Sequence, residues 1–97
     1  MNPTEQRVLA AIDEAGLLDA LGELVAVPSL GGTAEENRAQ EVAAAIMARC
    51  GLAVETWELD LPSLYTHPDC SWELPRERAL GVAGVLGESR GGRSLIF

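Results

Sequence analysis

A capped helix followed directly by a strand constrains the fold of this chain more than any other feature. Residues 34–50 place small apolar side chains on one face of a helix and mostly Glu and Arg on the other. Thr33 and Glu36 have the spacing of a capping box, and Gly51 offers the left-handed conformation that ends a helix. Residues 52–59 alternate with acids over part of their length, which indicates a strand. A helix packed on a sheet is therefore expected.

An earlier helix is predicted over residues 3–26. Asn2 is a good cap, Pro3 suits the first helical position, and an acid follows in the first turn. Apolar side chains then recur at helical spacing. Gly16 is expected to break or bend this helix, and Pro28 to end it, because the residue before a proline is pushed out of the helical region.

The second half of the chain reads as loop, strand, turn and strand. Residues 60–78 contain three prolines and no regular period, which predicts a long irregular loop. Residues 80–87 are rich in Gly and Val and predict a strand, and residues 93–97 predict another. A glycine-rich turn separates these two strands, so they are expected to pair as a hairpin.

Together these elements predict an α/β fold, a partial mixed sheet with helices packed on it. Three strands leave an open edge, which would be formed by the apolar residues Leu95, Ile96 and Phe97 unless more strands follow. Chain termini are normally exposed and polar. We therefore expect residues 1–97 to be the first part of a longer domain.

Composition narrows the class of protein. The chain of 97 residues is long enough for one small domain, and its 47% hydrophobic content argues against disorder. A net charge of −8, with no lysine, disfavours nucleic acid and anionic membrane surfaces as partners. No apolar run approaches the roughly 18 residues of a membrane span, and no secretory signal is visible. We expect a cytoplasmic protein in which Cys50 and Cys70 are reduced thiols.

The order of the motifs resembles the start of the zinc aminoacylase/carboxypeptidase family, which includes acetylornithine deacetylase and succinyl-diaminopimelate desuccinylase. The resemblance covers essentially the whole chain. The segments that carry it are the end of the first helix at 23–29, the capped helix from Glu35, residues 51–55 with Asp60, and residues 84–87 with 93–97. The loop 62–78, with the run His-Pro-Asp-Cys-Ser-Trp-Glu at 67–73, looks like a longer-loop, deacetylase-like subgroup.

The resemblance implies the N-terminal part of a zinc-dependent exopeptidase-like catalytic domain. Its members hydrolyse amide bonds of N-acyl amino acids or small peptides with two zinc or cobalt ions. The resemblance is also compatible with a homodimer of the full-length protein. The metals activate water and polarise the carbonyl, while a Glu takes the proton. In the family the first metal ligands lie in a Gly-His-x-Asp segment that would follow Phe97. No catalytic, cofactor-binding or metal residue is therefore expected within the 97, and this chain alone should be inactive.

Two groups of residues could be mistaken for a catalytic or metal site. Glu35 and Glu36 are adjacent, so their side chains point about 100° apart on a helix, and helix capping explains Glu36. His67, Asp69 and Cys70 offer three ligand types within four residues. Because a closed zinc site needs four ligands and the chain has a single His, surface-loop residues are the favoured interpretation.

Four single residues have simpler structural explanations. Cys50 lies at a helix end that disfavours thiolate, so a packed thiol is favoured over a nucleophile. Trp57 and Trp72 are expected to pack rather than serve as ligand platforms, and Ser29 has no visible His or Asp partner. Three regularly spaced glycines lie in a strand and not in the strand-to-helix turn of a phosphate loop: Gly81, Gly84 and Gly87.

Two other classes of protein stay open at this level. The chain could be a complete, small, non-catalytic interaction module that pairs with a partner through its exposed strand edge. A helical regulator fits the first half of the sequence but not the Gly- and Val-rich strands. For the hydrolase hypothesis the expected partner is a small N-acyl amino acid or peptide substrate, with no nucleic acid and no membrane.

Overall fold

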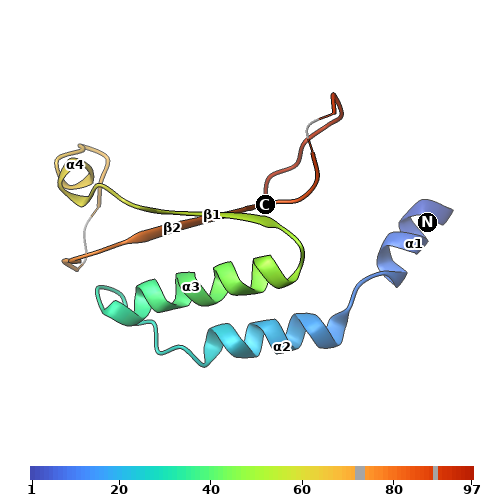
Figure 1. Cartoon of the computed structure of the whole chain (residues 1–97), viewed down its shortest axis with the longest axis horizontal. Helices are drawn as coiled ribbons and strands as arrows, with labels where there is room; N and C mark the ends of the chain where they lie inside the picture. Colours follow the sequence, from blue (N-terminus) through green and yellow to red (C-terminus); the bar gives the residue numbers. More distant parts are fainter. Residues whose placement is uncertain (72–73, 89) are drawn as a thin grey trace.

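The computed structural model describes residues 1–71, 74–88 and 90–97. In this part the chain is a small mixed α/β fold with four helices and a two-stranded antiparallel sheet (Figure 1). The elements in chain order are α1 (Pro3–Ala10), α2 (Glu14–Val25), α3 (Ala34–Arg49), β1 (Ala53–Glu58), α4 (Leu61–Tyr65) and β2 (Leu80–Val85).

The predicted helix over residues 3–26 is divided into α1 and α2. The Asn2 cap is confirmed: its side-chain oxygen accepts from the Glu5 amide at 2.8 Å, and the Glu5 carboxylate accepts from the Asn2 amide at 2.9 Å. The predicted position of the break was wrong. The Asp13 carboxylate accepts from the Gly16 amide at 3.0 Å, so Asp13 caps α2 and Gly16 lies within its first turn.

Helix α3 was predicted to within one residue, and Gly51 ends it with a φ of +85°. The predicted capping box was wrong. The Thr33 hydroxyl donates to the Leu30 carbonyl oxygen at 2.6 Å, and Thr33 makes no side-chain cap. The Glu36 carboxylate instead accepts from the Gly32 amide at 3.0 Å and pairs with Arg76, a charged partner that a local motif does not reveal.

The sheet pairs β2 with β1, in a register that runs from Ala53 opposite Val85 to Glu58 opposite Leu80. The predicted hairpin between residues 80–87 and 93–97 is therefore wrong, and residues 93–97 are not a strand. The long segment between β1 and β2 brings the chain back antiparallel to β1. All six residues of β2 therefore pair with β1. The described sheet is antiparallel, and not mixed as predicted.

The segment predicted as an irregular loop, 60–78, contains the short helix α4. Asp60 caps it by accepting from the Ser63 amide at 3.3 Å and from the Ser63 hydroxyl at 2.6 Å. Pro62 follows in the first turn, where its missing N–H costs nothing. Both hydrogen bonds to Ser63 hold the pKa of the Asp60 carboxyl below its usual range.

Helix α3 covers one face of the sheet and lies between the sheet and α2 (Figure 1). Gly84 marks the contact: a Cβ there would lie 2.8 Å from the Met47 sulfur and 2.7 Å from Leu52 Cδ2. The Trp57 ring lies directly over Gly81, its partner across the sheet. Because residues 81 and 84 point to opposite faces of the strand, Trp57 lies on the face away from α3.

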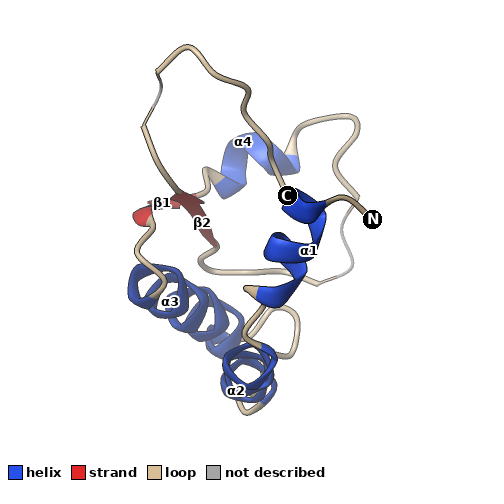
Figure 2. Cartoon of the chain, turned by 90° about the vertical axis from the view of Figure 1, so that its right-hand side faces the viewer, coloured by secondary structure: helices blue, strands red, loops and turns tan. Residues whose placement is uncertain are grey.

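The described residues bury little of their apolar surface. Among them Val27, at 8% exposed, is the single buried hydrophobic residue. The radius of gyration is 17.2 Å, against about 12.5 Å for a compact domain of this length. Helix α1 stands apart from the other elements (Figure 1), and α2 and α3 lie on the same side of the sheet (Figure 2). None of the described helices combines the length and the apolarity needed to cross a lipid bilayer.

Candidate functional site

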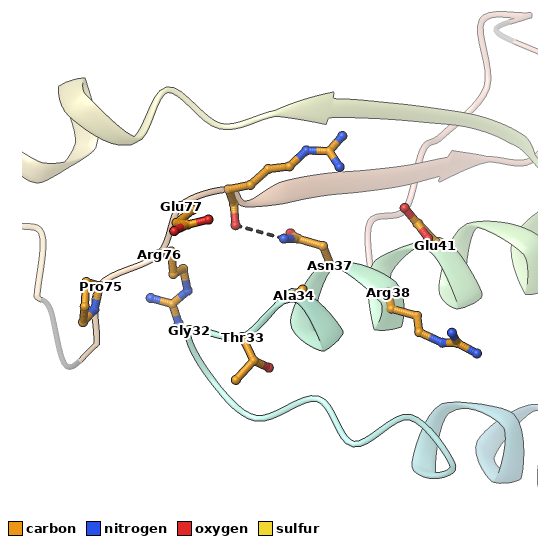
Figure 3. A pocket seen from close by; sticks show the side chains of 10 residues that line it. Gly32, Thr33, Ala34, Asn37, Arg38, Glu41, Pro75, Arg76 and Glu77 are labelled. Atoms are coloured by element: carbon orange, nitrogen blue, oxygen red, sulfur yellow. Dashed lines mark hydrogen bonds between the residues drawn. The ribbon is translucent and has the colours of Figure 1, made fainter.

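A hollow of about 580 Å³ lies where the segment before β2 meets the N-terminal end of α3 (Figure 3). A smaller hollow of about 330 Å³ lies on α1. The residues that line it come from these two regions: Gly32, Thr33, Ala34, Asn37, Arg38, Glu41, Pro75, Arg76, Glu77 and Arg78.

An ion pair between Arg76 and Glu36 holds the two regions together. Arg76 Nε donates to Glu36 Oε2 at 2.7 Å, and Arg76 Nη2 donates to Glu36 Oε1 at 2.9 Å. Both side chains are about two-thirds removed from solvent. The hydrogen bonds from Arg76, followed by the one from the Gly32 amide, hold the pKa of the Glu36 carboxyl below its ordinary value. Glu36 is therefore a fixed anion at neutral pH.

The backbone of Arg76 is held as well, by the last residue of α4. The Tyr65 hydroxyl donates to the Arg76 carbonyl oxygen at 3.1 Å and accepts from the Arg76 amide at 3.3 Å. Arg76 is thus bound to α4 through its backbone and to α3 through its side chain. This double attachment fixes the course of the chain just before β2.

Asn37 fixes the start of β2 in the same way. Its side-chain amide donates to the Arg78 carbonyl oxygen at 3.0 Å (Figure 3) and its side-chain oxygen accepts from the Leu80 amide at 3.0 Å. These two bonds imitate those of a neighbouring strand, because one donor and one acceptor engage the backbone on either side of Ala79. The Arg78 side chain pairs with Glu58 at the end of β1.

Every arginine that lines the hollow lies beside a carboxylate. Of the arginines that line it, Arg76 pairs with Glu36, Arg78 with Glu58, and Arg38 lies 3.8 Å from Glu35. Glu41 and Glu77 add two further negative charges. Each cation has an acidic partner, so this lining gives no particular attraction to an anionic ligand. The side chains around the hollow form a junction that positions β2 against α3.

The sequence-derived candidates are not brought together in the hollow. Glu36 lies beside it, while Glu35 faces Arg38. His67, Asp69 and Cys70 form a turn after α4, in which His67 Nδ1 accepts from the Asp69 amide at 3.2 Å and the Cys70 amide donates to the His67 carbonyl oxygen at 3.0 Å. Two of these three side chains are exposed and that of Cys70 is half-buried.

A zinc site does not fit the residues that the structure describes. Within 1–71, 74–88 and 90–97, no three His, Cys, Asp or Glu side chains lie close enough together to hold a metal ion. No step of the chemistry implied by the family resemblance can therefore be assigned to these residues.

The other single residues lie apart from the hollow. The prediction that Cys50 is a packed thiol was wrong, because Cys50 is exposed at the C-terminal cap of α3. Both cysteines are free thiols. Trp57 lies over Gly81, and Ser29 lies in the turn that follows α2, where its amide donates to the Val27 carbonyl oxygen at 2.8 Å. Trp72 falls outside the described residues. Gly81 and Gly84 lie in β2, and Gly87 follows it with a φ of +85°.

Sequence reasoning missed the three residues that build the junction: Asn37, Tyr65 and Arg76. Arg76 and Glu36 are 40 positions apart, so no helix or turn periodicity connects them. Nothing local singles out Asn37 either, because the residues one turn further along the helix, at 40 and 41, are also polar. Comparison of this chain with protein-family models, with curated proteins and with solved structures finds no match.

Proposed function

We propose that the chain is the N-terminal part of the catalytic domain of a metal-dependent amidohydrolase that cleaves N-acyl amino acids or small peptides. The reaction class rests on the resemblance of the motif order to the zinc aminoacylase/carboxypeptidase family. In this proposal residues 1–97 supply framework, and the metal ligands and the catalytic Glu come from other polypeptide. Two zinc ions would supply the activated water and the polarised carbonyl there.

The observation that carries the incomplete-domain part of the proposal is the exposed surface. The accessible surface is 8188 Å², against about 5,400 Å² for a folded monomer of this mass. Apolar side chains on α1, on α2 and between them contribute to it, and each of the following is more than half exposed: Val8, Leu9, Ile12, Leu17, Leu18, Leu21 and Val25. Surface of this kind is normally covered inside a domain.

The sheet supports the same interpretation. Helix α3 covers one face, while Trp57 and Val85 on the opposite face are exposed. An antiparallel sheet often leaves one face in water, but that face is then usually polar, whereas Trp57 and Val85 are apolar. Further polypeptide over the Trp57 face would cover these side chains.

The test is an activity assay on the complete reading frame that contains these residues. We expect the purified, zinc-loaded product to hydrolyse N-acetyl amino acids or dipeptides, to lose this activity with a chelator and to regain it with zinc. The 97-residue chain, assayed in parallel, should hydrolyse none of them. Hydrolysis by the zinc-loaded 97-residue chain, or none by the complete product, would overturn the proposal.

A second candidate is a non-catalytic interaction module, and the described sheet gives it one specific support. With two strands, the outer edges of β1 and β2 both lack a neighbouring strand in the described structure. Residues 93–97 are not a strand, so pairing with a partner would use one of these two edges. A monomer with sharp, cooperative unfolding would favour this candidate, because a self-sufficient module needs its own stable core.

A further inference from the structure

We draw no further inference here: the strongest candidate, the exposed apolar face of α1 and α2 formed by Val8, Leu9, Leu17, Leu18, Leu21 and Val25, is an unpartnered surface, and nothing in the described structure shows what covers it.

Discussion

At the scale of single residues, the contacts that shape this molecule join positions far apart in the sequence. The local cap at Asn2 was predictable, because a capping side chain bonds to an amide only three residues away. The partner of Glu36 was not. Its local candidate was Thr33, but the doubly hydrogen-bonded guanidinium of Arg76 offers a stronger, charge-assisted interaction.

The first prediction concerns the carboxyl of Glu36. Replacing Arg76 by Gln removes the main cause of its lowered pKa, so the pKa should rise toward its ordinary value. The measurement is an NMR titration of the Glu36 side-chain carboxyl carbon. The matched control is Arg38→Gln, because Arg38 pairs with Glu35 and not with Glu36. An Arg76→Gln titration that overlays the wild type would contradict the assigned ion pair.

The sign of the pH dependence follows from the same shift. A carboxyl whose pKa is lowered by folding stabilises the fold above its unfolded pKa, about 4.3 for Glu, and loses that contribution as the pH falls through the lowered value. Acidification should therefore loosen the attachment of Arg76 to α3. The amide resonance of Gly32, which donates to Glu36, should move over the same pH range as the carboxyl.

The second prediction tests Asn37. Asn37→Ala removes both bonds to the start of β2 and should cost about 1–2 kcal/mol of local stability, seen as faster hydrogen exchange of the Leu80 amide. Asn37→Asp is the matched control, because its carboxylate still accepts from Leu80 but cannot donate to the Arg78 carbonyl. Of the two variants, only Asn37→Asp should keep the Leu80 amide protected from hydrogen exchange. Unchanged protection in the Ala variant would show that Asn37 does not hold the strand.

At the scale of elements, those with strong local end signals were predicted well. Helix α3 ends where Gly51 provides a left-handed residue, and the helix packs on the sheet as expected, with Met47 beside Gly84. The helix break at residues 11–13 was misplaced to Gly16, because the capping preference of Asp13 outweighs the flexibility of a glycine. Strand pairing was wrong because it depends on the path of the segment between β1 and β2, which includes α4, and not on the two strands nearest in sequence.

The third prediction compares two glycines. Gly84→Ala would place a Cβ against Met47 and Leu52, where α3 meets the sheet, and should destabilise that contact by about 1–3 kcal/mol. Gly22→Ala, in α2, meets nothing within 4 Å and should be neutral or stabilising by up to about 1 kcal/mol. Hydrogen-exchange protection of the β1 amides measures both. Equal effects of the two substitutions would contradict the packing of α3 on the Gly84 face.

At the scale of the whole molecule, the α/β class and the packing of a helix on a sheet were predictable from periodicity alone. The exposure of the sheet face that carries Trp57 and the separate position of α1 were not predictable. Periodicity shows that a face is apolar, but it does not show what that face contacts. The candidate site was hardly predictable either. The junction around Arg76 is built from three long-range contacts, made by Glu36, Tyr65 and Asn37, that leave no trace in local sequence.

The fourth prediction follows from the exposed apolar surface. The isolated 97-residue chain should bind a hydrophobic dye such as ANS and unfold over a broad range of urea, because it has few buried contacts to lose together. A variant with both Leu17 and Leu21 changed to Glu should bind less dye, since these side chains form an exposed stripe of α2. A sharp transition with no dye binding would contradict the incomplete-domain proposal and favour the interaction module.

The central claim, that these residues belong to a larger metal-dependent hydrolase domain, is tested most directly by reading the coding sequence beyond the codon for Phe97. The account predicts that the reading frame continues directly into a Gly-His-x-Asp segment, the expected source of the first metal ligands. A stop codon at that point, or a continuation without such a segment, would contradict the claim.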